Sequence, residues 1–294
     1  MSKVKKISRW LGIILGVLLL LILVGYGFIY LSTEQRMNRK YSFSEPALII
    51  PTDSVAIVKG KHLYQIRSCA DCHGPNLAGG VFMNSALLMQ LSAPNLTKGP
   101  GGLPPDFTTQ DWLRVLRHGV DKNGRSLWMM PAHESTGLSQ EDMASLIAYC
   151  QSVPPVVSAG KKRRQMGPLG RVVLQLNQVA VLPAERINHQ VPMAASAPKD
   201  VTAYGQYLAT VCQGCHRPNM KGGAPLAPGF PPVPDISATG VQQQWSEAQF
   251  ISTIRQGKTP AGKLLRQEFM PWQNMQHFTD EELSAIRSYL VSLK

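Results

Sequence analysis

The chain has 294 residues, enough for about two domains of ordinary size. Its formal net charge is +12, yet no nucleic-acid motif and no basic stripe interleaved with aromatic residues accompanies that charge, which excludes a nucleic-acid-binding function. Four of the five cysteines belong to two short motifs, so no structural disulfide is expected.

Near the amino terminus, residues 10–31 contain no charged residue. As a helix this segment is about 33 Å long, enough to cross the hydrocarbon core of a membrane. Basic residues precede it, which predicts a cytoplasmic amino terminus. A cleaved signal peptide is the alternative, but no A-x-A-like cleavage site follows. We expect residues 1–31 to form a single-pass anchor in the cell inner (cytoplasmic) membrane, with the remaining chain facing the periplasm.

The net charge of the exported part also predicts the kind of partner or surface that it would approach. Four of the basic residues lie before the anchor, leaving 26 basic and 18 acidic residues, or +8 (26 − 18). This excess would steer encounters with an acidic protein partner or an anionic membrane surface.

After a polar tether at residues 32–52, a pentapeptide with the pattern Cys-x-x-Cys-His occurs at residues 69–73 and again at 212–216. This pattern is the attachment signature of c-type haem: two thiols form thioethers to one porphyrin, and the next residue offers an imidazole to the iron. We therefore expect two covalently bound haem c cofactors. The predicted attachment residues are Cys69, Cys72, Cys212 and Cys215, and the predicted proximal ligands are His73 and His216.

The motifs belong to a longer repeat, because residues 69–80 read CADCHGPNLAGG and residues 212–223 read CQGCHRPNMKGG. A zinc site would need about four protein ligands, and no second cysteine pair lies at finger spacing. A thioredoxin-like pair would leave the histidine after both motifs unexplained.

Both copies are predicted to be small all-α units. A helix at 55–68 leads into the first motif, and tyrosines stand five residues before each motif, at Tyr64 and Tyr207. Four capping-box patterns mark further helix starts. They begin at Thr108, Ser139, Ser246 and Thr279. The fifth cysteine, Cys150, lies on the apolar side of a predicted helix and is interpreted as core.

Between the copies lies a connecting strap, residues 159–200. Its apolar centre, residues 171–182, is expected to pack against one or both units, since a structureless insert of this length is unusual. A basic run at 161–164 is expected to be a solvated face, with partner docking or membrane-surface contact as the alternative.

A Met-Pro pair occurs at matching places in both copies, eight residues before Leu138 and Phe278. A thioether is a soft ligand that raises the haem potential, so Met130 and Met270 are the predicted distal ligands. Bis-histidine ligation is the alternative. It is disfavoured because no remaining histidine has a histidine at the matching place. Those histidines are His62, His118, His133, His189 and His277; Met129 and Met275 likewise lack repeat partners.

With these motifs the copies resemble class I, mitochondrial-type cytochrome c domains, over residues 53–158 and 201–294. The layout resembles membrane-anchored dihaem cytochromes c. The resemblance implies an all-α fold class, an N-terminal transmembrane helix plus two tandem haem domains. It also implies that the Pro94 carbonyl accepts a hydrogen bond from His73. Pro234 is the counterpart for His216, although the second copy reads Pro-Asp-Ile where the first reads Pro-Asn-Leu.

The expected function is electron transfer, not catalysis, so no catalytic residue is predicted. The chain would carry single electrons on the periplasmic side, between a quinol- or substrate-oxidising complex and a terminal oxidase. Two alternatives stay open. A cytochrome subunit fixed in a dehydrogenase or oxidase complex is favoured by the Met-Pro-Trp and Thr-Asp-Glu-Glu-Leu segments of the second copy, which resemble the cytochrome subunits of quinoprotein and flavin dehydrogenases. A dihaem peroxidase would need one open distal site, against the paired Met-Pro loops.

Overall fold

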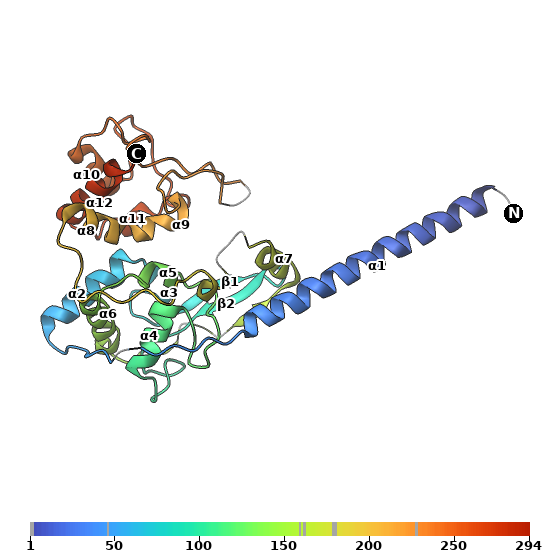
Figure 1. Ribbon diagram of the computed structural model, residues 1–294, viewed down its shortest axis with the longest axis horizontal. Coiled ribbons are helices and arrows are strands. Elements are labelled where there is room, and N and C mark those ends of the chain that lie inside the picture. Colours follow the sequence, from blue (N-terminus) through green and yellow to red (C-terminus); the bar gives the residue numbers. More distant parts are fainter. Residues whose placement is uncertain (1–2, 46, 159, 161–162, 178–180, 227–228) are drawn as a thin grey trace.

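The computed structural model describes residues 3–45, 47–158, 160, 163–177, 181–226 and 229–294. A long helix, α1 (Lys3–Asn38), projects from two helical units that follow it in the chain (Figure 1). Its apolar side chains are exposed along its length, as in Leu18 and Leu31. Among the described residues it is the one helix long and apolar enough to cross a membrane.

Helix α1 is longer than the predicted anchor, which ended at residue 31. Its last turns continue because they are held from outside: the Arg36 guanidinium forms an ion pair with Glu185 at 2.6 Å and donates to the Leu174 carbonyl at 2.8 Å. The first part of the predicted tether is therefore helix.

The first unit contains five helices and the second repeats their order. The first has α2 (Ser54–Ile66), α3 (Ala70–His73), α4 (Thr109–His118), α5 (Ala132–Ser135) and α6 (Gln140–Ser152). The second has α8 (Val201–Leu208), the 3₁₀ turn η2 (Ala209–Cys212), α9 (Gln213–His216), α10 (Glu247–Gln256), α11 (Trp272–Met275) and α12 (Asp280–Ser292). This correspondence confirms two helical units built from one repeated pattern.

In each unit the first helix crosses the last one closely. Gly60 of α2 and Gly205 of α8 occupy equivalent places, and a Cβ at either would overlap a backbone carbonyl of α6 or α12. Buried side chains of both units then merge into one apolar cluster that includes Cys150, only 4% exposed, as predicted for a core residue.

Three capping boxes are complete, at Thr108, Ser246 and Thr279. The fourth is one-sided: Ser139 accepts from the Asp142 backbone, but the Asp142 carboxylate accepts from the Tyr207 hydroxyl of the second unit at 2.5 Å.

The first unit also carries a small antiparallel sheet that was not predicted. Its strands are β1 (Gly80–Asn84), β2 (Met89–Ala93) and β3 (Arg164–Met166), in the order β1-β2-β3. Strand β3 comes from the strap, so the sheet depends on pairing between distant segments. The mostly helical fold class is confirmed, with this sheet as an addition.

The strap packs against the first unit and α1. Helix α7 (Pro168–Leu176) lies beside α1, and the turn η1 (Pro183–Glu185) follows. Leu174 and Leu182 are buried with Met37 and Trp128. Residues 178–180 of the apolar centre and 161–162 of the basic run lie outside the described residues. Arg163 and Arg164, the described residues of that run, are exposed, as predicted for a solvated face, and the Arg164 guanidinium also stacks over Trp128 at 4.8 Å.

Candidate haem-binding sites

Each predicted attachment motif forms a one-turn helix at the end of a longer one. Helix α3 follows α2, and α9 follows α8 through η2. All four motif cysteines are unpaired and partly buried. Cys69 and Cys212 pack against the apolar cluster that both units share. Each pair therefore presents free thiols beside an apolar surface.

The two motif histidines have the same partner. Nδ1 of His73 lies 3.0 Å from the Pro94 carbonyl oxygen, and Nδ1 of His216 lies 3.0 Å from that of Pro234. Burial lowers the pKa of both imidazoles, so they are neutral near pH 7. Because the proton sits on Nδ1, the Nε2 lone pair is left for a metal.

The loops that deliver these prolines are built alike. The amide of Gly79 donates to the His73 carbonyl at 2.9 Å, and the amide of Gly222 donates to that of His216 at the same distance. Both glycines have positive φ and approach the backbone before Asn95 or Asp235 so closely that a Cβ would not fit. The Pro-Asp-Ile segment of the second copy thus has the same backbone role as Pro-Asn-Leu in the first.

The two loops differ in backbone strain at one position, the residue directly after the motif histidine. The residue after the motif histidine has φ 75°, ψ 164° in the first copy, where it is Gly74, and φ 70°, ψ 164° in the second, where it is Arg217. This backbone region suits glycine almost alone. We expect Arg217→Gly to raise the free energy of unfolding by about 1 kcal/mol. Chemical denaturation of the purified holoprotein measures it. Gly74→Ala is the matched control and should destabilise; a neutral or destabilising effect of Arg217→Gly would contradict the strain.

The thiols do not have the character of a redox pair. Burial raises the pKa of Cys69 and of Cys212 to about 12, and it also raises the pKa of Cys72 and Cys215. A thioredoxin-like pair has a lowered thiol pKa. The structure therefore gives no support to that alternative.

The two Met-Pro pairs have matching places. Each lies directly before a one-turn helix that begins after the proline, α5 or α11, and Met130 and Met270 both pack against the shared apolar cluster. Met275 is buried in that cluster, and Met129 packs with Trp128 in the smaller cluster beside α1. Three of the remaining histidines have other partners: His62 contacts Glu282, and His118 contacts Glu45 and His189.

These donors fit a haem c in each unit: free thiols in a pair, a neutral imidazole with an available Nε2, an apolar surface, and a thioether at the same place in both copies. His73 with Met130, and His216 with Met270, would hold the two irons, with Cys69, Cys72, Cys212 and Cys215 as the covalent attachments. While Nε2 of each histidine bound the iron, Nδ1 would keep its hydrogen bond to the carbonyl oxygen of Pro94 or Pro234.

Both motif helices lie at the contact between the units. Asn274 of α11 donates to the Asp71 carboxylate of α3 at 2.6 Å. At the equivalent places, Gly214 of α9 lies against Glu134 of α5. A Cβ added to Gly214 would be 3.4 Å from Oε1 of Glu134. Figure 1 shows α5 on the side of the first unit that faces α9 and α11 of the second. Each attachment helix therefore contacts the Met-Pro segment of the other unit.

Arg67, two residues before Cys69, joins the units at the centre of this contact. It is 7% exposed and donates to the Thr210 hydroxyl and to the Tyr207 carbonyl, and its guanidinium lies over the Tyr207 ring. It also donates to the Glu134 carbonyl at 3.2 Å. The sequence reasoning missed Arg67. The only available signal was that an arginine precedes one motif where threonine precedes the other.

Glu134 is a second carboxyl at this contact, in addition to Asp71, and burial raises its pKa to about 7 although Arg67 opposes that shift. The pKa of Glu134 in the folded chain is thus above its ordinary value of 4.5, so the folded state binds the proton more tightly. The stability from this proton is present below about pH 4.5 and is lost as pH rises through 7, a loss of about 3 kcal/mol.

We expect Glu134→Gln to remove this loss, so the variant gains stability over the unmodified chain at pH 8 but not at pH 4.5. Denaturation of both holoproteins at the two pH values measures the difference. Glu141→Gln, at an exposed carboxylate, is the control. An equal effect of Glu134→Gln at both pH values would contradict the raised pKa.

Comparison with known proteins gives one family and several relatives. A family model described as cytochrome c matches residues 57–154 and 202–294. The cytochrome c subunit of a quinone alcohol dehydrogenase from Gluconacetobacter polyoxogenes is 27% identical over 270 residues, 82% of this chain and 56% of the relative. The gluconate 2-dehydrogenase cytochrome c subunit of Pantoea cypripedii is 29% identical over 271 residues, 81% of this chain and 60% of the relative. The chain thus spans little more than half the length of these relatives.

Proposed function

The chain belongs to the cytochrome c family, and from this premise we propose that it is the membrane-anchored dihaem subunit through which a dehydrogenase complex passes electrons. Electron transfer through covalently bound haem c follows from the family. The number of haems, their ligands and the complex are our proposal. The names of both relatives, which are cytochrome c subunits of dehydrogenases, favour a fixed subunit over the freely shuttling carrier expected from the sequence, and give no support to a terminal oxidase as partner.

The observation that carries the proposal is the repeated histidine environment. A haem c bound in each unit would supply a one-electron iron couple. The chain's contribution is to fix each imidazole through Pro94 or Pro234, to keep it neutral by burial, and to offer a thioether from Met130 or Met270. If a histidine and a methionine both bound each iron, no coordination position would be left for a substrate, which argues against a peroxidase.

The contact between the units supports transfer within the chain. Asp71 with Asn274, and Gly214 with Glu134, bring each attachment helix against the other unit. Arg67 bonds across the same contact. These contacts would hold the two haem sites in a fixed relation, so that an electron received in one unit has its next acceptor in the other.

The membrane position rests on α1. Its charge-free segment and the basic residues before it favour a single span with both units on the periplasmic side. A dehydrogenase subunit docked there would deliver electrons at the outer face of the inner membrane.

Purification of the carboxy-terminally tagged chain from mildly solubilised membranes tests this function. We expect a dehydrogenase subunit to co-purify, and an alcohol or a sugar acid to reduce the haems of that preparation. Untagged membranes provide the background. A chain that purifies alone from such membranes, while added quinol still reduces its haems, would show a free carrier instead.

A further inference from the structure

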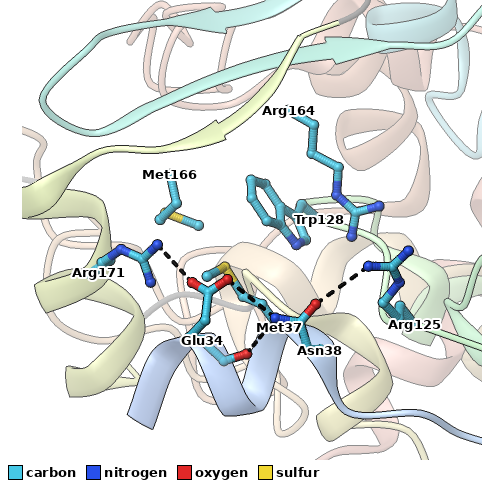
Figure 2. Close-up of a pocket in the computed structure, with 8 residues that line it drawn as sticks. All are labelled: Glu34, Met37, Asn38, Arg125, Trp128, Arg164, Met166 and Arg171. Carbon is cyan, nitrogen blue, oxygen red and sulfur yellow. Dashed lines mark hydrogen bonds and ion pairs between the residues drawn. The ribbon is translucent and has the colours of Figure 1, made fainter. Parts of the chain in front are cut away.

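A cavity of about 390 Å³ lies where α1 meets the first unit and the strap (Figure 2). The last turns of α1 supply Glu34, Met37 and Asn38 to its wall. The opposite wall comes from segments far away in the sequence: the loop before the Met130-Pro131 pair, strand β3 and helix α7. None of the predicted haem residues lines it.

The cavity carries more positive than negative charge. Three guanidinium groups line it, from Arg125, Arg164 and Arg171, against the single lining carboxylate of Glu34. Glu34 is already paired with Arg171 at 2.8 Å, as Figure 2 shows. Outside the cavity, Arg164 lies 3.5 Å from Asp121. The Arg125 guanidinium donates to the Asn38 side-chain oxygen at 3.4 Å, its one side-chain partner in the described part of the chain.

Among the described residues, two donors at this wall are buried and have no hydrogen-bond partner: Nε of Arg125 and the indole Nε1 of Trp128. A buried donor left unpaired is costly, and an anionic oxygen is the acceptor that satisfies it best. Phosphate oxygens can accept from several guanidinium and indole N–H groups at once. The donor set therefore suits a phosphate-class anion.

The position of the cavity along α1, close to the expected membrane surface, points to a lipid. The exposed apolar side chains of α1 continue to Leu31, and the first cavity residue, Glu34, comes about 4.5 Å further along the helix. At this level Arg171 stacks on Tyr30 at 4.0 Å. The exposed Leu169 and Leu176 of α7 lie beside α1. Aromatic and basic side chains next to apolar ones are typical of the headgroup region.

We propose that this cavity binds the phosphodiester of an anionic phospholipid from the outer leaflet, with Arg125, Arg164 and Trp128 donating to its oxygens. Met37 and Met166 form an apolar part of the cavity wall, against which the glycerol end of the lipid would pack. Free phosphate offers the same oxygens but gains nothing from that wall or from the exposed leucines of α7. The inference rests on the proposed membrane span of α1. Bound lipid would fasten the first unit against the membrane in one orientation.

Native mass spectrometry of the full-length holoprotein in mild detergent tests the site, with phosphatidylglycerol, phosphatidylcholine and inorganic phosphate as separate probes. We expect phosphatidylglycerol to be retained at least about tenfold better than phosphatidylcholine. The double variant Arg125→Gln/Arg164→Gln should lose at least about tenfold of that retention, because it removes charge-assisted hydrogen bonds. Arg163→Gln, at an exposed neighbour that bonds Asn84 instead, should retain the lipid fully.

A second variant guards against misfolding: Trp128→Phe keeps the ring and removes only the indole donor, and it should weaken retention a fewfold. Equal retention by all variants, or displacement of the lipid by equimolar phosphate, would overturn the lipid site. Loss of the unmodified chain from the membrane in an alkaline wash would instead overturn the proposed anchor. A chain that stays in the membrane with both haems, yet shows no lipid preference, would overturn this inference alone.

Discussion

Replacing Cys212 and Cys215 together with serine is expected to lower the covalently bound haem from two per chain to one. A thioether needs sulfur, and these two thiols are the ones that the second motif presents, unpaired and beside the apolar cluster. A unit of fewer than about 100 residues buries a smaller fraction of its surface than a larger domain does, and bound haem would add buried apolar surface to it. The second unit should therefore also unfold at lower denaturant concentration.

Haem per chain is measured by pyridine haemochrome absorbance and by the mass of the intact chain. Cys150→Ala is the matched control, since this thiol is 4% exposed in the core and belongs to neither motif. It should keep both haems and lose only packing energy. Two covalent haems in the serine variant would refute the attachment sites.

Replacing Met270 with leucine is expected to lower the potential of one haem by on the order of a tenth of a volt or more, because the thioether favours ferrous iron. The sulfur-to-iron absorption of that haem should disappear, while leucine preserves the apolar volume. Met130→Leu should do the same to the other haem. Redox titration followed by visible absorbance separates the two.

Two other methionines serve as controls for these variants. Met275 is buried in the same cluster, with 8% of its surface exposed, and Met129 is next to Met130 in the sequence. Leucine at either place should leave both potentials unchanged. If the controls shift a potential and the Met-Pro variants do not, the ligand assignment is wrong. If none of the four does, neither Met130 nor Met270 binds iron, and bis-histidine ligation is the alternative to test next.

The repeat predicted the helical units because most of its signals are local. A capping box lies within four residues, so Thr108, Ser246 and Thr279 were recognisable without any knowledge of the fold. The fourth box was predicted on the same pattern, and it is incomplete because Asp142 bonds Tyr207 across the units. A hydrogen bond to a residue in another unit cannot be recognised from a local sequence pattern.

The end of the anchor was placed by composition, which changes after residue 31. The helix continues to Asn38 because Glu185 and the Leu174 carbonyl bind Arg36 from more than 130 residues away in the chain. The third strand of the small sheet has a similar origin, since β3 pairs with β2 although residues 94–163 separate the two strands in the chain.

By itself the sequence determined the fold class and predicted the haem-binding residues of this protein, because the signals for both lie in contiguous segments: two Cys-x-x-Cys-His motifs, paired Met-Pro loops and one charge-free helix. Only the tertiary structure decided how these parts meet. Arg67 and Glu134 at the contact between units, and the cavity that joins Glu34 to Arg164, are assembled from distant residues. Their contacts depend on packing across the folded chain, and local sequence carries no information about such packing.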